Sequence, residues 1–258
     1  MNIAILGFGI MGTQISALMS LLDFNVTIFT NYSDLELFNR NKKKLSKLFN
    51  LPINNKSIIF KNYKELFDTN SLVIECVNEN LDLKKKNYEI FKNAKYGFFS
   101  NSSSFVHNEI GTGVNSLHFF NPINLKILET SIDHTGDNLV YNTLLDKLKK
   151  INFDFFKINK NRGYLGNSIV FYQISNFFYL QERLFYNYED IIRMSNKLNL
   201  QLNPINLIDL IGVDTCLKIL KNLNEKNNQF YIPEILQTAL DKNILGKKNK
   251  TSIKSLLK

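Results

Sequence analysis

The sequence has no tryptophan, few prolines and only two cysteines, Cys76 and Cys216. Two cysteines are too few for a disulfide framework, and such sparse use favours the reducing cytoplasm. No apolar run is long enough to cross a membrane, and no Cys and His residues are spaced as metal ligands. The N-terminus lacks the basic segment and cleavage site of a signal peptide. These absences predict a cytoplasmic protein without a membrane span or a metal site.

The chain carries a formal net charge of +9, which admits nucleic acid, an anionic membrane or an anionic small substrate as partner. Its lysines are scattered over polar positions, apart from runs at 42–44 and 84–86, and no nucleic-acid-binding motif accompanies them. We therefore expect no nucleic-acid partner. With 258 residues, of which 44% are hydrophobic, the chain can form two domains with packed cores.

Short apolar strands alternate with helical patterns up to about residue 160. The expected strands lie at 2–6, 25–30, 71–77, 97–100, 115–119, 125–131 and near 153–158, and the first helices at 10–22, 33–49 and 81–93. Later patterns are helical only, at 164–187, 189–199, 205–222 and 232–243. Strands that are apolar throughout are typical of a mostly parallel sheet covered on both faces. The sequence predicts an α/β domain at 1–160 and an all-helical domain at 161–258, with a weakly packed tail from residue 247.

Gly7, Gly9 and Gly12 form a G-x-G-x-x-G pattern between the first expected strand and the first expected helix. In such a turn the first glycine makes the turn, the second admits a pyrophosphate to the backbone, and the third lets helix and strand pack closely. The N–H groups at the start of the helix, around Ile10 and Met11, then face the phosphates. This context predicts a Rossmann-type dinucleotide-binding domain.

The end of the second strand usually carries an acid that bonds the ribose 2′-hydroxyl, but here that position is Thr30. The hydroxyl group of Thr30 can still bond the ribose of NAD. A site without the acid also tolerates the 2′-phosphate of NADP, with Arg40 or lysines 42–44 nearby. We expect NAD as the cofactor, and NADP stays open.

Several segments resemble the 3-hydroxyacyl-CoA dehydrogenase family, in the family's order, over about residues 1–246. They are GFGIMGTQIS, SLVIECVNENLDLKKKNYEIF, SNSSS at 100–104, LHFFNP at 117–122, ILE at 127–129, GYLGNSIV at 163–170, LIDLIGVDT at 207–215 and ILGK at 244–247. The combination of LHFFNP with the glycine turn is specific. The resemblance implies an enzyme that interconverts 3-hydroxyacyl and 3-oxoacyl thioesters by hydride transfer with a nicotinamide dinucleotide.

Carried over position by position, the resemblance makes His118, Glu129, Ser103 and Asn167 the catalytic set. Alcohol oxidation needs a base for the hydroxyl proton, and histidine serves near neutral pH. A carboxylate behind the ring, here Glu129, fixes the tautomer and stabilises the imidazolium. Ser103 and Asn167 can hydrogen-bond the substrate oxygen as its charge develops.

The same resemblance places Glu79, Lys84 and Asn101 at the cofactor. The other two histidines, His107 and His134, join no such constellation, and we expect both at the surface. The aromatic-rich segment 169–186 exposes more apolar surface than one small domain covers, which predicts a homodimer through the helical domain.

The chain departs from the family pattern at several places. Ser168 replaces an arginine, Asn203 precedes Pro204 in place of glycine, and the region after the second strand that helps to hold CoA is short. The acyl carrier can therefore be CoA or an acyl-carrier protein, as in polyketide extender-unit biosynthesis. A 3-hydroxyisobutyrate-type dehydrogenase shares the glycine turn but lacks HFFNP. A different class, a degenerate non-catalytic dinucleotide-binding protein, is disfavoured because all four catalytic positions are retained.

Overall fold

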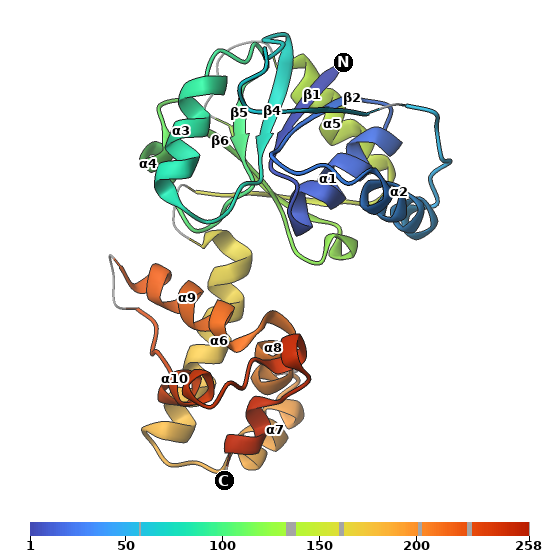
Figure 1. Cartoon of the computed structure of the whole chain (residues 1–258). Coiled ribbons are helices and arrows are strands. Elements are labelled where there is room, and N and C mark those ends of the chain that lie inside the picture. Colours follow the sequence, from blue (N-terminus) through green and yellow to red (C-terminus); the bar gives the residue numbers. More distant parts are fainter. Residues whose placement is uncertain (57, 133–137, 160–162, 201–202, 226–228, 258) are drawn as a thin grey trace. The chain divides into compact units, whose positions relative to one another are not determined.

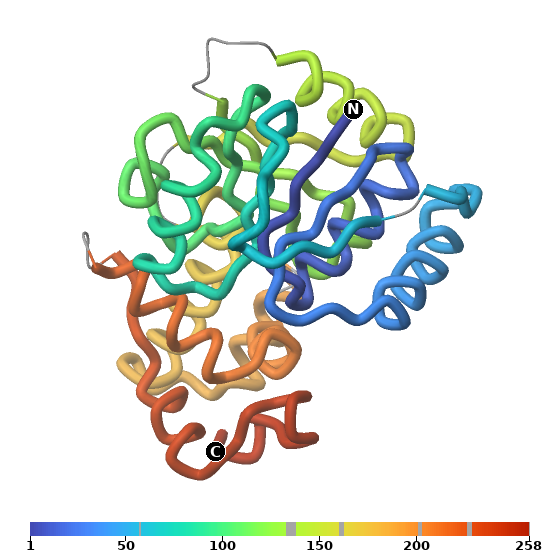
Figure 2. Tube along the Cα trace, turned by 45° about the horizontal axis from the view of Figure 1, so that its top comes forward, coloured from blue at the N-terminus to red at the C-terminus, as the bar shows by residue number. Residues whose placement is uncertain are grey.

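The computed structural model describes the chain except for residues 57, 133–137, 160–162, 201–202, 226–228 and 258. The chain divides into two compact units, Met1–Asn161 and Arg162–Lys258. Figure 2 follows the trace from the blue N-terminal strand, through the green segments of the first unit, to the orange and red helices of the second. None of the helices in the described part of the chain is both long enough and apolar enough to cross a membrane.

The described residues of the first unit form one eight-stranded sheet in the order β3-β2-β1-β4-β5-β6-β7-β8. The strands are β1 (Asn2–Leu6), β2 (Asn25–Phe29), β3 (Ile58–Lys61), β4 (Ser71–Glu75), β5 (Phe98–Ser100), β6 (Asn115–Phe119), β7 (Ile127–Ser131) and β8 (Asp154–Lys157). All neighbours pair in parallel except β6 and β7, which are antiparallel. The predicted fold class, a mostly parallel sheet followed by a helical domain, is confirmed.

Helices cover both faces of this sheet (Figure 1). They are α1 (Ile10–Leu21), α2 (Leu35–Phe49), α3 (Leu81–Phe91), the short α4 (His107–Ile110) and α5 (Leu139–Lys150). Because side chains alternate along a strand, Ile3 and Ile5 pack with α1, α2 and α5, whereas Ala4 and Leu6 pack with α3 and α4. Both faces of β1 are therefore buried, which explains why its sequence is apolar throughout.

The regular elements among the described residues of the second unit are all helices or 3₁₀ turns. It contains α6 (Tyr164–Glu182), α7 (Tyr188–Lys197), α8 (Pro204–Ile211), α9 (Val213–Asn224), α10 (Glu234–Asp241) and the 3₁₀ turns η2 (Gly246–Asn249) and η3 (Ile253–Leu256). The single helix expected at 205–222 is wrong, because Gly212, with φ at +101°, separates α8 from α9. The expectation of a weakly packed tail is also wrong, because Ile253 is fully buried and its N–H donates to Asp209 Oδ1 at 2.9 Å.

Candidate active site

Several of the sequence-predicted residues of the first unit lie at the carboxyl ends of the parallel strands. Gly7, Thr30 and Asn101 directly follow β1, β2 and β5, and Cys76, which was not predicted at the site, directly follows β4. The strand order reverses between β1 and β4, because β2 and β3 lie on one side of β1 and the later strands on the other. In open α/β sheets, ligands bind outside the carboxyl ends of the strands at this reversal point.

The glycine turn has the geometry that a bound pyrophosphate requires. Gly7 has φ at +95°, and a Cβ on it would lie 2.8 Å from the backbone oxygen of Cys76. A Cβ on Gly12 would lie 2.2 Å from the backbone oxygen of Gly7, so helix α1 and the turn touch there. A Cβ on Gly9 would meet no protein atom within 4 Å, which leaves open space beside the N-terminus of α1. These contacts fit a dinucleotide at this turn.

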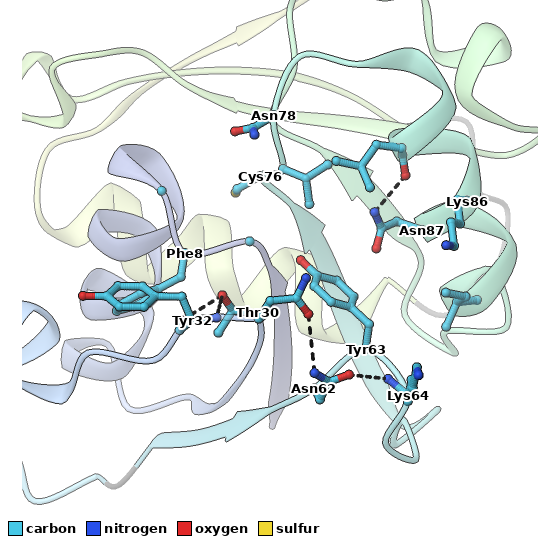
Figure 3. Close-up of a pocket in the computed structure, with 16 residues that line it drawn as sticks. Phe8, Thr30, Tyr32, Asn62, Tyr63, Lys64, Cys76, Asn78, Lys86 and Asn87 are labelled. Atoms are coloured by element: carbon cyan, nitrogen blue, oxygen red, sulfur yellow. Dashed lines mark hydrogen bonds between the residues drawn. The ribbon is translucent and has the colours of Figure 1, made fainter.

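A cavity of about 610 Å³ lies against the glycine turn (Figure 3). Its lining comes from the glycine turn, the ends of β2, β3 and β4, and helix α3. The lining residues are Gly7, Phe8, Gly9, Thr30, Asn31, Tyr32, Asn62, Tyr63, Lys64, Cys76, Val77, Asn78, Leu83, Lys86, Asn87 and Ile90. Burial, and after it the charge of Glu75, raises the pKa of Tyr63 to about 12, so its hydroxyl stays neutral at physiological pH.

Thr30 lines the cavity, but its hydroxyl is engaged in a local turn. The Thr30 Oγ1 donates to the backbone oxygen of Tyr32 at 2.8 Å and lies 3.1 Å from the N–H of the same residue. Both its donor and an acceptor site are therefore used within the loop that follows β2. Contact with a ribose would compete with this turn, and the predicted role of Thr30 stays a prediction.

His118 and Glu129 face each other across the antiparallel pair of β6 and β7. They are register partners in the sheet, which places their side chains on the same face. His118 Nδ1 lies 2.7 Å from Glu129 Oε2. The glutamate side chain is 1% exposed, whereas the histidine side chain is 12% exposed. The buried carboxylate thus holds the ring, as in a catalytic dyad, and a water-accessible part of the ring remains.

The loop after β5 is tied to the strand that carries this histidine. The N–H of Phe119, the residue after His118, donates to Asn101 Oδ1 at 2.9 Å. The Asn101 N–H donates in turn to the backbone oxygen of Glu75 at 2.8 Å. Half-buried Ser103 lies two residues farther along the same loop. The side chain of Asn101 therefore fixes the loop with Ser103 to the strand with His118.

A buried ion pair between Lys84 and Glu75 lies close to this loop and is linked to it by hydrogen bonds. Lys84 Nζ lies 2.9 Å from Glu75 Oε1, and both side chains are fully buried. Ser100 Oγ donates to Glu75 Oε2 at 2.7 Å, and Ser102 Oγ donates to Glu79 Oε2 at the same distance. The Lys84 ammonium also lies 3.9 Å from Glu79 Oε2. Lys84 was predicted at the cofactor; in this structure it has no exposed surface, and it links Glu79 to the end of β4.

The remaining polar predictions have different outcomes. Asn167 lies in the first turn of α6, within the second unit, and is half-buried. The surface role expected for His107 is wrong, because the residue is 1% exposed and its Nδ1 lies 3.4 Å from Ser131 Oγ. It begins α4, which packs on the sheet, so its short helix carries it inward. His134 lies outside the described residues.

Sequence analysis missed Glu75 and residues 62–64 at the carboxyl ends of these strands. Glu75 had a usable signal, because a carboxylate in an otherwise apolar strand needs a buried partner. Asn62, Tyr63 and Lys64 had none, because β3, which places them, was not predicted. Its four residues, IIFK, follow a polar loop and give too short a pattern.

Comparisons with known proteins bear on both units. A model of the 3-hydroxyacyl-CoA dehydrogenase NAD-binding domain matches residues 2–154, and a model of the 3-hydroxyacyl-CoA dehydrogenase C-terminal domain matches residues 163–255. A probable 3-hydroxyacyl-CoA dehydrogenase of Caenorhabditis elegans is 25% identical over 242 residues, covering 83% of this chain and 78% of that protein. The alpha subunit of the fatty acid oxidation complex of Idiomarina loihiensis is 27% identical over 197 residues; the match covers 71% of this chain but 27% of that protein.

Solved structures resemble the chain over nearly its full length. FadB2 of M. tuberculosis has a TM-score of 0.79 at 21% identity and is covered to 97%, as is this chain. The (S)-3-hydroxybutyryl-CoA dehydrogenase PaaH1 of Ralstonia eutropha has a TM-score of 0.78 at 21% identity, with coverage of 98% of this chain and 97% of that one. At these identities the likeness shows a shared fold.

Proposed function

This chain belongs to the 3-hydroxyacyl-CoA dehydrogenase family, and on that premise we propose that it interconverts a 3-hydroxyacyl thioester and its 3-oxoacyl form with His118 as the general base. The first unit is the family's NAD-binding domain, and NAD is the cofactor. The observation that carries the proposal is the 2.7 Å contact between His118 Nδ1 and the buried Glu129 carboxylate. A non-catalytic dinucleotide-binding protein has no need of a buried acid behind a partly exposed imidazole.

NAD, when bound, supplies the hydride acceptor for the hydroxyl-bearing carbon. Since Glu129 engages Nδ1 of His118, proton uptake from the substrate hydroxyl falls to Nε2. The ring then becomes an imidazolium, and the glutamate stabilises its positive charge. In the reverse direction the same Nε2 returns the proton to the oxygen of the 3-oxo group. His118, supported by Glu129, thus carries the proton while the carbon–oxygen bond of the substrate changes between single and double.

Ser103 and Asn167 are proposed to complete the catalytic set by donating to the substrate oxygen. Support for Ser103 comes from its loop, which Asn101 ties to the residue after His118. Support for Asn167 comes from the family resemblance of the segment that carries it. Stabilisation of a developing charge by such positioned donors is a common source of rate enhancement.

The cofactor contacts are proposed to centre on Gly7, Gly9 and Gly12, with the first N–H groups of α1 at Ile10 and Met11 facing the phosphates. The open space at Gly9 supports this placement. Thr30, Glu79, Lys84 and Asn101 remain proposed contributors near the cofactor. For Lys84 the buried ion pair favours an indirect part, through Glu79.

The acyl carrier is the part of the proposal that an assay decides. The purified protein should reduce acetoacetyl-CoA with NADH, and acetoacetyl-carrier protein should be tested beside it. Higher kcat/KM with acetoacetyl-CoA assigns the protein to acyl-CoA metabolism, and the opposite ranking assigns it to carrier-bound intermediates. Absence of NADH oxidation with both thioesters would refute the proposed function.

We also propose a cytoplasmic homodimer, for which the sparse cysteines and the apolar helical surface are the support.

A further inference from the structure

The cavity wall around the end of β2 differs from an ordinary NAD site in its charges. Among its described lining residues there is no carboxylate, whereas Lys64 and Lys86 bring two ammonium groups (Figure 3). The usual acid at this place accepts hydrogen bonds from the ribose hydroxyls and repels a 2′-phosphate. Here no carboxylate of the described lining supplies that repulsion.

The side-chain oxygens of Asn31, Asn62 and Thr30 each accept a hydrogen bond from a neighbouring loop residue. Asn31 Oδ1 accepts from Asn62 Nδ2 at 3.4 Å, and Asn62 Oδ1 accepts from the N–H of Lys64 at 3.1 Å. The Thr30 hydroxyl is held by Tyr32 in the same way. The side-chain donors among the lining residues at the ends of β2 and β3 include the amide groups of Asn31 and Asn62 and the Lys64 ammonium, with one amide N–H of Asn62 already donated to Asn31. Donors and a positive charge suit a phosphate better than a pair of hydroxyls.

Two acids of the loops after β2 and β3 accept hydrogen bonds from groups of their own loops. Asp34 Oδ1 accepts from the N–H of Leu37 at 2.8 Å and caps α2, while its Oδ2 accepts from the Tyr32 hydroxyl. Glu65 Oε1 accepts from the N–H of Asn62 at 2.6 Å. Neither of these two acids is part of the described cavity lining.

We propose that Asn31, Asn62 and Lys64 form a subsite for the 2′-phosphate of an adenosine, so that the protein binds NADP(H) in addition to NAD(H). Asn31 and Asn62 donate amide N–H groups to the phosphate, and Lys64 balances its charge. The inference rests on the proposed function only for the placement of a dinucleotide in this cavity. It assigns the discrimination between NAD(H) and NADP(H) to the loops after β2 and β3 and not to the Thr30 hydroxyl.

Binding of the reduced cofactors tests this directly, because the chain has no tryptophan and nicotinamide fluorescence can be excited and read without that background. The wild-type protein should bind NADPH and NADH with dissociation constants within about tenfold of each other, because loss of one charge-assisted contact corresponds to about that factor. A wild-type protein that binds NADH but more than about 100-fold more weakly NADPH would overturn the inference, as would binding of neither dinucleotide.

Two substitutions locate the subsite. Lys64→Gln should weaken NADPH about tenfold and leave NADH unchanged, because only the phosphate uses the charge. Asn31→Asp should weaken NADPH further and leave NADH bound, because it introduces the missing carboxylate. The matched control is Lys85→Gln, an exposed lysine of α3 that does not line the cavity. Equal weakening of both cofactors by Lys64→Gln would contradict the assignment.

These titrations need no turnover, so the two proposals fail separately. A protein that binds both dinucleotides with the expected response to Lys64→Gln, but reduces no 3-oxoacyl thioester, supports the subsite and refutes the proposed function. A protein that reduces acetoacetyl-CoA with NADH, but whose NADPH affinity ignores both substitutions, supports the function and refutes the subsite.

Discussion

At the residue scale, Cys76 reports on the environment of the cofactor cavity. Burial, with a further contribution from the charge of Glu75, raises the pKa of its thiol above the ordinary range. Because the thiolate is the reactive form, a raised pKa lowers reactivity at any given pH. In a Cys216→Ser background, iodoacetamide should modify Cys76 slowly at pH 7 and faster only as the pH rises beyond the ordinary thiol range. Rapid modification at pH 7 would contradict a raised thiol pKa at Cys76.

The contact between His118 and Glu129 is the part of the site that the family resemblance predicted best. A resemblance at HFFNP and at ILE named His118 and Glu129, and the antiparallel register of β6 and β7 makes them direct neighbours. The state of Thr30 could not be predicted, because its turn depends on the backbone of Tyr32. The burial of His107 was missed because its helix is only four residues long and carries no periodic pattern.

At the element scale, the buried pair of Lys84 and Glu75 joins α3 to the end of β4. Removing one partner leaves an uncompensated buried charge, so Lys84→Met should lower the free energy of unfolding by about 3–5 kcal/mol. Chemical denaturation measures this. The double variant Lys84→Met with Glu75→Leu should recover much of the loss, because no unpaired charge remains. If the loss of unfolding free energy in the double variant equals the sum of the losses in the two single variants, Lys84 and Glu75 contribute independently, and the ion-pair account is contradicted.

The turn between β1 and α1 allows a matched pair of glycine substitutions. Gly12→Ala should destabilise the fold by about 1–3 kcal/mol, because its Cβ would lie 2.2 Å from the backbone oxygen of Gly7 and the helix must shift. A Cβ on Gly9 would meet no protein atom within 4 Å, so the Gly9→Ala variant should unfold at the same temperature as the wild type. It should weaken NADH binding, because the added methyl group occupies the space proposed for the pyrophosphate. Thermal unfolding with NADH titration separates the two effects. Unaltered NADH affinity in Gly9→Ala would place the pyrophosphate elsewhere.

The long elements were predictable because burial leaves a periodic trace in the sequence. The continuous apolar strands and the helical spacing of 10–22 reproduce β1, β2, β4 and α1 within a few residues. Neither β3 nor α5 was predicted: β3 is a four-residue strand at the sheet edge, and α5 was overlooked although Asn138, its N-cap residue, directly precedes the apolar residues that begin it. The break at Gly212 was missed because the apolar spacing continues through it.

At the scale of the whole molecule, α6 carries an exposed apolar stripe. Leu165, Ile169, Tyr172 and Tyr179 recur at helical spacing, and each is 43% exposed or more. A surface of this kind usually marks an interface. Light scattering should give twice the mass of one chain, and Ile169→Glu should shift the protein toward monomer. Leu66→Glu, at a 90% exposed position of the first unit, is the control and should stay dimeric. A monomeric wild type at micromolar concentration would contradict the proposed assembly.

The central claim is that the His118–Glu129 pair performs the acid–base chemistry of a hydroxyacyl dehydrogenase. The measurement that tests it most directly is kcat for acetoacetyl-CoA reduction by His118→Ala, with NADH affinity measured in parallel. Loss of a positioned general base should lower kcat by about 10²–10⁴-fold. NADH affinity should be unchanged, because the glycine turn holds the dinucleotide. A kcat like that of the wild type would contradict the claim.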